Sequence, residues 1–487
     1  MVKVTRRRFL EDSLLVATAA LVGTDGIGSA LAQEPKTPNT TRTVGPNDRI
    51  RLAQIGMHGR GMAHLDGYLG QKDATVVAIC DIDQHVTANA AKVIEKKSGK
   101  APRIYQDLRQ LYEDKEVDAV SMALPIHWHS LAAIWAMQAG KDVYVEKPVC
   151  HNLFEAQRMI EAPQKLSRIC QAGTQSRSHK AVQEAVAYIH AGKIGKVYLA
   201  RGLCYKPRGS IGIQPDGPVP AGVDYNIWLG PAPERPFNPN RFHYNWHWFW
   251  DYGAGDLGNQ GIHQMDIARW ALNKTELPNS VVSLGGRFGY VDQGETPNTE
   301  LTLFDYGDAQ LIFEVRGLKT DALKGVKIGD IVYGEHGYVA FTGDYGKAAA
   351  FDNDGKVVQE FRGSGDHFRN YLDAIRSRKT SDLHAPVAEG ARSSALCHLG
   401  NISYRLGSPV PLSDKTNHFG SSKDAAETFD RFEQHLSDNG VKLERETYRL
   451  GRALKINAQN WNFGNDQEAN ALLTRKYRAP FVVPEKL

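Results

Sequence analysis

Short apolar segments alternate with helix-like segments early in this 487-residue chain, and this alternation constrains the fold more than any other feature. Strand-like segments are expected at 51–56, 75–80, 117–124, 142–145 and 168–172, and helix-like segments between them at 60–68, 86–97, 130–139 and 153–162. Such alternation is typical of a doubly wound parallel sheet in an α/β protein. The sequence therefore predicts a doubly wound α/β domain over residues 50–172, preceded by a Pro- and Thr-rich linker at 33–49.

The pattern changes after residue 173. Strand-like segments then follow one another at 197–205, 281–288, 300–304, 310–316 and 338–341, and helices are expected at 367–376 and 389–405. Successive strands indicate an antiparallel sheet, so we predict a second, α+β domain at 173–410. Residues 411–487 form an extension of unknown role, with helical character at 424–437.

The N-terminus is predicted to be an export signal. Arg6-Arg7-Arg8-Phe9-Leu10 precedes an apolar run at 14–22, and Ala30-Leu31-Ala32 has the small residues of a cleavage site. Residues 1–32 therefore resemble a twin-arginine signal peptide, and the apolar run is too short for a stable membrane span. We expect a periplasmic protein that is exported, already folded, by the twin-arginine machinery.

Composition favours a small-molecule ligand. The net charge of +4 is spread along the chain without a basic block, so no nucleic acid partner is expected. The five cysteines have neither metal-ligand spacing nor a disulfide pattern, and we expect them to pack in the core.

A glycine loop, Gly56-Met57-His58-Gly59-Arg60-Gly61, follows the first predicted strand and precedes a helix. In this context the loop predicts a dinucleotide phosphate site, although His58 stands where the second glycine of the fingerprint is usual. Asp81 ends the second strand, where a carboxylate can accept both ribose hydroxyls of NAD and would repel the 2′-phosphate of NADP. We therefore predict NAD as cofactor, with NADP less favoured.

Glu146-Lys147-Pro148 follows the apolar strand at 142–145. Ligands of an open parallel sheet bind beyond the carboxyl ends of its strands, so Lys147 is expected beside the reactive ring of the cofactor. The Lys147–Pro148 bond is also one of the few in the chain that could be cis.

Three further segments with histidine are candidates for the site. His127 and His129 follow the strand at 117–124, where they could contact the cofactor, cap the next helix or bind a metal; their spacing favours the first two roles, and no metal site is predicted. Residues 242–250 alternate aromatic with polar side chains, which predicts an extended segment whose rings stack on a sugar or pack in the core. Asn259 and His263 are four apart, so a helix would place both on one face.

Together these motifs resemble the Gfo/Idh/MocA oxidoreductase family, which includes glucose–fructose oxidoreductase and inositol dehydrogenases, over residues 50–408. The resemblance implies an N-terminal NAD-binding Rossmann domain at 50–172 and a C-terminal domain with a large open sheet. It also implies oligomers formed through that sheet, and polyol or sugar substrates. It carries over the catalytic residues Lys147 and His263, whereas Asn259 stands where the family usually has aspartate. Asp256 or Asp266 could supply the missing carboxylate.

The predicted site therefore combines three sets of residues. The catalytic residues are Lys147, His263 and Asn259. The cofactor-binding residues are Gly56, Met57, His58, Gly59, Arg60, Gly61, Asp81, Ile82, Leu124, Pro125, His127, His129, Glu146, Lys147 and Gln175. The substrate-binding residues are Tyr205, His243, His247, Trp248, Asn259 and His263.

The predicted reaction is hydride transfer from a secondary alcohol of a sugar, polyol or glycoside to NAD. Because an exported enzyme meets no soluble nicotinamide pool, its tightly bound cofactor is expected to be recycled in place. Redox-assisted glycoside cleavage ranks second, because the related NAD-dependent glycosidases lack the lysine of Glu-Lys-Pro. A catalytically inactive carbohydrate-binding protein is the third alternative.

Overall fold

The computed structural model describes residues 45, 48–414 and 418–487, so the predicted export signal lies outside the described residues. In this part of the chain, no helix has the length and apolar character needed to cross a membrane.

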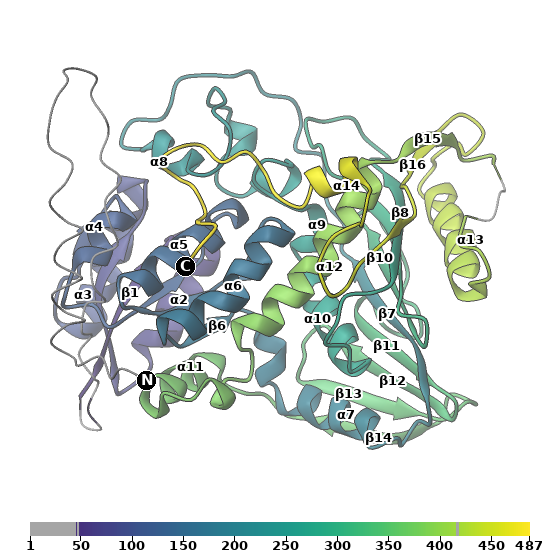
Figure 1. Ribbon diagram of the computed structural model, residues 1–487, viewed down its shortest axis with the longest axis horizontal. Helices are drawn as coiled ribbons and strands as arrows, with labels where there is room; N and C mark the ends of the chain where they lie inside the picture. The colour runs from purple at the N-terminus through teal and green to yellow at the C-terminus, as the bar shows by residue number, and fades with distance from the viewer. Residues whose placement is uncertain (1–44, 46–47, 415–417) are drawn as a thin grey trace, which may run out of the picture. The chain divides into compact units, whose positions relative to one another are not determined.

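The first domain is the predicted Rossmann fold (Figure 1). Its parallel strands lie in the order β3-β2-β1-β4-β5-β6, which is the doubly wound order of dinucleotide-binding domains. The elements are β1 (Ile50–Ile55), α2 (Gly59–Leu69), β2 (Ala74–Cys80), α3 (Gln84–Ser98), β3 (Arg103–Tyr105), α4 (Leu108–Glu113), β4 (Ala119–Met122), α5 (Ile126–Gln138), β5 (Asp142–Val145), α6 (Leu153–Leu166) and β6 (Cys170–Ala172).

Every residue of β4 and β5 is buried, as expected for central parallel strands covered by helices on both faces. Side-chain caps fix where several helices begin: Asp83 accepts a hydrogen bond from His85 N before α3, and Asn152 accepts one from Glu155 N before α6. Because the strands are parallel, the loops after β1, β2, β4 and β5 emerge at one edge of the sheet.

The second domain contains a large, mostly antiparallel sheet, as predicted. Its strands lie in the order β14-β13-β12-β11-β7-β10-β9-β8-β16-β15, with β17 also paired to β8. Among the described residues, β7 and β10 are the only neighbouring strands of this sheet that run parallel. The strands are β7 (Val197–Tyr205), β8 (Ser280–Gly286), β9 (Thr299–Asp305), β10 (Gln310–Arg316), β11 (Ile328–Gly334), β12 (Gly337–Thr342), β13 (Lys347–Phe351), β14 (Val357–Arg362), β15 (Ser408–Pro411), β16 (Thr447–Leu450) and β17 (Leu454–Lys455).

Helices cover both faces of this sheet (Figure 1). Leu311 and Phe313 of β10 belong to the core with α10 and α12, whereas Ile312 between them packs with α13, because successive strand residues point to opposite faces. The helices and 3₁₀ turns are η1 (Gln175–Ser178), α7 (Lys180–His190), α8 (Tyr225–Leu229), η2 (Pro239–Arg241), η3 (Asn245–Trp248), α9 (Gly255–Gly258), α10 (Gly261–Ala271), α11 (His367–Ser377), η4 (Thr380–Asp382), α12 (Val387–Arg405), α13 (Lys423–Asp438) and α14 (Gln467–Ala471).

The C-terminal extension contacts both domains. Its strands β16 and β17 join the large sheet, as does β15 at its beginning, and its last residues return to the Rossmann domain (Figure 1). There the Phe481 ring lies 5.5 Å from that of Trp128 in α5, while Arg478 donates to the carbonyl of Asn226 in α8. The extension therefore ties α5 to the segment that follows β7.

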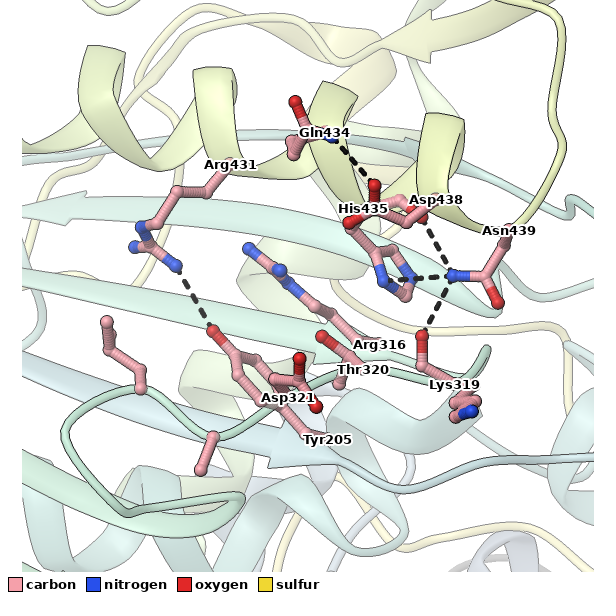
Figure 2. Close-up of a pocket in the computed structure, with 12 residues that line it drawn as sticks. Tyr205, Arg316, Lys319, Thr320, Asp321, Arg431, Gln434, His435, Asp438 and Asn439 are labelled. Atoms are coloured by element: carbon pink, nitrogen blue, oxygen red, sulfur yellow. Dashed lines mark hydrogen bonds between the residues drawn. The ribbon is translucent and has the colours of Figure 1, made fainter.

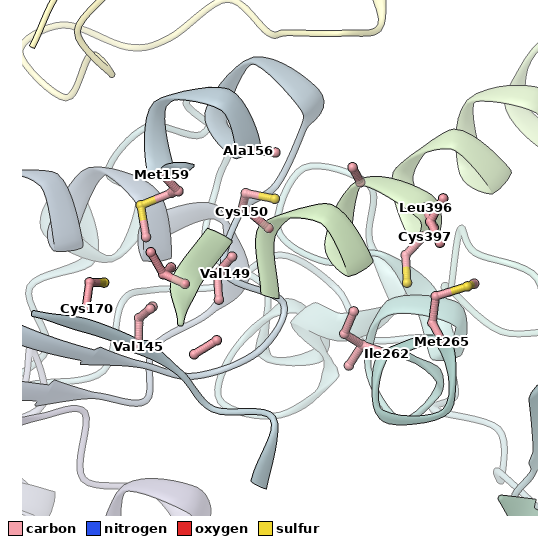
Figure 3. Packing of buried hydrophobic residues seen from close by; sticks show 14 of the residues in the cluster. Val145, Val149, Cys150, Ala156, Met159, Cys170, Ile262, Met265, Leu396 and Cys397 are labelled. Carbon is pink, nitrogen blue, oxygen red and sulfur yellow. The ribbon is translucent and has the colours of Figure 1, made fainter. Parts of the chain in front are cut away.

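All five cysteines are free and buried. Figure 3 shows Cys150 and Cys170 in the core near α6, and Cys397 facing α10 from α12. They pack as small apolar side chains, as the sequence predicts.

Candidate active site

The predicted site residues converge on a cleft of about 410 Å³ at the carboxyl edge of the Rossmann sheet. The loops after β1, β2, β4 and β5 form one wall, and the segment from α8 to the start of α10 forms the other. The predicted residues that line it are Gly56, Met57, His58, Gly59, Arg60, Asp81, Ile82, Leu124, Pro125, His129, Glu146, Lys147, His243, His247 and Asn259.

The glycine loop is shaped for close approach. A Cβ at Gly56, which has φ +81°, would lie 2.3 Å from the Ala123 carbonyl oxygen, and one at Gly61 would lie 1.9 Å from the Gly56 oxygen. Neither position can carry a side chain, so the backbone forms the cradle that dinucleotide phosphates need. His58 leaves this cradle clear because its ring turns to the second domain and packs 4.1 Å from that of His243.

Asp81 is anchored beside the loop. Its carboxylate accepts hydrogen bonds from Met57 N at 2.7 Å and Asp83 N at 3.0 Å. Burial raises the pKa of Asp81, and these two backbone donors act in the opposite direction. The carboxylate is therefore held at the place where the ribose of a dinucleotide would bind.

Glu146 connects the cleft to the Rossmann core. Its Oε1 accepts hydrogen bonds from Arg60 Nε at 2.8 Å, His64 Nε2 at 3.0 Å and Gln175 Nε2 at 2.7 Å. Burial alone would raise the pKa of Glu146, but Arg60 and His64 hold it well below its usual range. Gln175 thus lies behind the cleft wall and contacts Glu146.

Lys147 reaches across the cleft. Its peptide bond to Pro148 is cis, and its Nζ donates a 2.8 Å hydrogen bond to the backbone carbonyl of Asn259. Burial lowers the pKa of Lys147, with the charge of Glu146 opposing the shift. A lysine with a lowered pKa loses its proton more readily than a lysine in water.

His263 lies in the first turn of α10, is 9% exposed and is not among the described residues that line the cleft. Burial first, and then the charge of Lys147, lowers the pKa of His263 well below its ordinary value, so the imidazole is neutral. Its Nδ1 is buried and has no hydrogen-bond partner among the described residues. A neutral, unpaired imidazole nitrogen is equipped to accept a proton.

Asn259 and His263 do not share one helix, contrary to the prediction. Helix α9 ends at Gly258 and α10 begins at Gly261, so Asn259 lies in the break between them. Glycine has a low helix propensity, and two of them flank this break. The break frees the Asn259 carbonyl for Lys147, while its Nδ2 donates to Asp256 Oδ1 at 3.3 Å.

Asp256 and Asp266, the carboxylates that could replace the aspartate usual at position 259, both form ion pairs. Arg208 donates to both oxygens of Asp256 at 2.7 Å, so Asp256 is held beside Asn259 as part of an ion pair. Asp266 pairs with Arg177 and Ser393, both at 2.6 Å. Asp256 is therefore the carboxylate connected to the site.

His127 and His129 point to different backbone carbonyls. His127 Nε2 lies 2.9 Å from the Trp228 oxygen, and His129 Nδ1 lies 2.5 Å from the Pro148 oxygen. Burial lowers the pKa of His127 to about 3 and that of His129 to about 4. His129 lines the cleft, whereas His127 instead joins α5 to the second domain.

The aromatic segment is not extended, contrary to the prediction. Within it, Asn245–Trp248 form the 3₁₀ turn η3. The Phe242 ring packs 5.4 Å from that of Trp228 in α8, which also lies 4.8 Å from the Tyr252 ring, and this packing outweighs the period-two pattern. Trp228, Phe242, Tyr244 and Trp246 line the cleft, whereas Trp248 lies under Arg208 at 5.2 Å.

Tyr205 is not brought to the cleft. It lines a separate cavity of about 400 Å³ beneath α13, where its hydroxyl donates to Glu314 at 2.7 Å and Arg431 approaches it (Figure 2). Glu314 also pairs with Arg316 and Arg431, each at 2.9 Å.

The sequence reasoning missed Lys206. Its Nζ donates to Gln260 Oε1 at 2.9 Å, and its charge lowers the pKa of both Lys147 and His263, after burial. It directly follows Tyr205 at the end of β7 and carried no motif of its own. His64 lies three residues beyond the glycine loop and Trp128 lies between His127 and His129, so both were missed although they stand beside predicted residues.

A Rossmann domain with a dinucleotide cradle and a lysine at the strand ends, joined to an open-sheet domain, defines a two-domain dinucleotide-binding protein. Residues 50–174 match the NAD-binding Rossmann fold of the GFO_IDH_MocA oxidoreductase family, and residues 205–435 match its C-terminal alpha/beta domain. The chain belongs to this family.

Solved structures share the fold. The WlbA dehydrogenase from Bordetella pertussis, in complex with NADH and UDP-GlcNAcA, is 19% identical with a TM-score of 0.55, over 73% of this chain and 97% of the other. Levoglucosan dehydrogenase, in complex with NADH and levoglucosan, is 17% identical with a TM-score of 0.56, over 72% and 96%.

Curated relatives match a shorter region. A glycosyl hydrolase family 109 protein from Shewanella pealeana is 27% identical over 176 residues, and one from Shewanella sp. (strain W3-18-1) is 30% identical over 181 residues. These matches cover 34% and 35% of this chain, and the chain spans 39% of the length of each relative.

Proposed function

We propose that this protein is an exported NAD-dependent oxidoreductase that removes hydride from a secondary alcohol of a sugar, polyol or glycoside. The observation that carries the proposal is the Lys147 ammonium, held 2.8 Å from the Asn259 carbonyl in a cleft that also has the dinucleotide cradle. The aromatic rings of Trp228, Phe242 and Trp246 offer flat surfaces for the CH faces of a sugar.

The residues have separate roles in this reaction. NAD⁺, when bound on the glycine loop, supplies the hydride acceptor. Lys147 donates a hydrogen bond to the alcohol oxygen and stabilises its developing negative charge. His263 accepts the hydroxyl proton, and as the carbon-bound hydrogen leaves with its electron pair, the alcohol becomes a ketone. Asn259 holds a neighbouring hydroxyl, and Asp256 and Arg208 hold Asn259.

A second candidate is glycoside cleavage assisted by a transient ketone, with the hydride returned afterwards. The similarity to glycosyl hydrolase family 109 proteins supports it, at 27% identity over 34% of this chain. In glycoside cleavage the hydride returns to the sugar, so NAD⁺ is regenerated in each cycle. In the oxidoreductase reaction a second sugar would reoxidise the NADH. Either route suits an exported enzyme with one tightly held NAD.

The decisive experiment compares Lys147→Ala with Lys100→Ala, an exposed lysine outside the cleft. The bound nucleotide is released and identified, and sugars and glycosides are screened for a change in nicotinamide absorbance and for cleavage products. We expect Lys147→Ala to lower turnover about 10²–10³-fold with unchanged NAD content. Retained turnover would contradict the role of Lys147, and cleavage without net reduction would select the second candidate.

Export is tested separately. Replacing Arg6 and Arg7 together by lysine preserves charge but removes the arginine pair that the export machinery reads. We expect the variant to stay in the cytoplasmic fraction while the unchanged protein reaches the periplasm. Equal periplasmic recovery would contradict export by this route.

A further inference from the structure

Three potential metal ligands meet at the mouth of the cleft. They are His58 from the glycine loop, Asp83 from the turn between β2 and α3, and His243 from the turn between η2 and η3. Their nearest ligand atoms all lie within 4.8 Å of one another. The two rings are 4.1 Å apart, and His243 Nε2 is 3.7 Å from Asp83 Oδ2.

The carboxylate of Asp83 is fixed in direction. Its Oδ1 accepts a 2.9 Å hydrogen bond from His85 N at the start of α3, which leaves Oδ2 for His243. Asp83 is 7% exposed, whereas both histidines are exposed to solvent at the cleft mouth. Among the described residues, neither imidazole donates or accepts a hydrogen bond other than this approach to Asp83. The three groups therefore have free ligand atoms that face one another.

Only one of the two histidines, His243, stands where the backbone favours glycine. His243 has φ +54°, a left-handed conformation that costs a residue with a side chain about 1 kcal/mol. His58 has an ordinary extended φ of −78° but replaces the second glycine of the dinucleotide fingerprint. A strained residue and a departure from the motif bring two imidazoles to one point, which a shared ligand explains better than packing, because both rings remain exposed.

We propose that His58, Asp83 and His243 bind a divalent transition-metal ion of the zinc class, which fastens the glycine loop to the second domain across the mouth of the cofactor cleft. Two imidazoles and one carboxylate form a common three-ligand set for zinc and leave one position for water or another oxygen.

This site differs from the proposed catalytic centre. Lys147 and His263 would act without the metal, and the metal would act on the cofactor by slowing its release. Since His58 and His243 both line the cleft, joining them closes the path between the two walls. The chain would thereby retain its dinucleotide in a compartment that offers no replacement.

The test uses full-length protein without a polyhistidine tag, freed of metal with EDTA and titrated with Co²⁺ or Zn²⁺. We expect one equivalent of either ion, with visible Co²⁺ bands of a four-coordinate site. His243→Gly and Asp83→Asn should bind at least about 10-fold more weakly. Glycine suits φ +54° and asparagine can still cap α3, so both variants are expected to fold, as checked by circular dichroism. His85→Ala removes a neighbouring imidazole outside the cluster and should bind like the unchanged protein.

The release of NAD⁺ gives an independent readout. With Zn²⁺ present, we expect NAD⁺ to dissociate about 10-fold more slowly from the unchanged protein and at an unaltered rate from His243→Gly. Absence of Co²⁺ or Zn²⁺ binding, or equal binding by the two cluster variants, would overturn the site. Metal binding at the cluster with no effect on NAD⁺ release would overturn its role as a fastener.

Discussion

Replacing Glu146 by glutamine tests how the Rossmann core supports the catalytic lysine. The substitution keeps the volume of a side chain that is 4% exposed and removes its charge. Three side chains donate to Oε1, and a hydrogen bond to a charged acceptor is worth about 1 kcal/mol more than one to a neutral acceptor. The loss of about 3 kcal/mol is partly offset because a buried charge no longer has to be desolvated and because the Arg60 side chain is 44% exposed.

We therefore expect Glu146→Gln to lower the free energy of unfolding by about 2 kcal/mol in urea denaturation. Glu113→Gln, at an exposed position of α4, should change it by less than about 0.5 kcal/mol. Because the Glu146 charge raises the pKa of Lys147 against burial, its removal should also move the alkaline limb of the activity profile to lower pH. Unchanged stability together with an unmoved alkaline limb would refute this account of Glu146.

Three further predictions address the cofactor cradle, the proton acceptor and the C-terminal extension. Gly61→Ala, whose Cβ would lie 1.9 Å from the Gly56 oxygen, should weaken NAD⁺ binding about 10–100-fold in calorimetry, whereas Gly209→Ala, which has open space, should not. The acid limb of kcat/KM should fall below pH 6.5, the ordinary histidine pKa, because burial keeps His263 neutral; His263→Ala should remove this limb as well as most of the activity. Phe481→Ala, at a 1% exposed position against Trp128, should cost about 3–5 kcal/mol in unfolding free energy, while Val482→Ala, 45% exposed, should cost less than about 0.5 kcal/mol.

The elements predicted from local pattern agree closely with the structure. β7, β10 and β5 have the predicted bounds, because each is a run of strand-forming residues delimited by polar or turn residues. β13 and β14 were missed: the first is rich in alanine and the second is mostly exposed, so neither carries the apolar alternation of a half-buried strand. Tyr205 was wrongly predicted to bind the substrate. Neighbouring residues of β7 point to opposite faces of the sheet, and Tyr205 lies on the face that does not border α10.

The candidate site was predictable where the topology determines it. The carboxyl ends of parallel strands meet at one edge, so Gly56, Asp81 and Lys147 could be placed together without any knowledge of their contacts. Their partners could not be, because Arg60 and His64 reach Glu146 across more than eighty residues of sequence through the packing of α2 on the sheet.

The position of His58 was predictable from the sequence, but its contact was not. From the sequence it weakens the dinucleotide fingerprint, since a side chain at this position should obstruct the phosphates. In the fold it does not, because the ring turns away from the cradle and meets His243, a residue nearly two hundred positions later. A departure from a motif thus becomes interpretable only with the tertiary partner that it contacts, and here that partner has its own unfavourable backbone conformation. The coincidence of the two departures is the reason to look for a ligand between them.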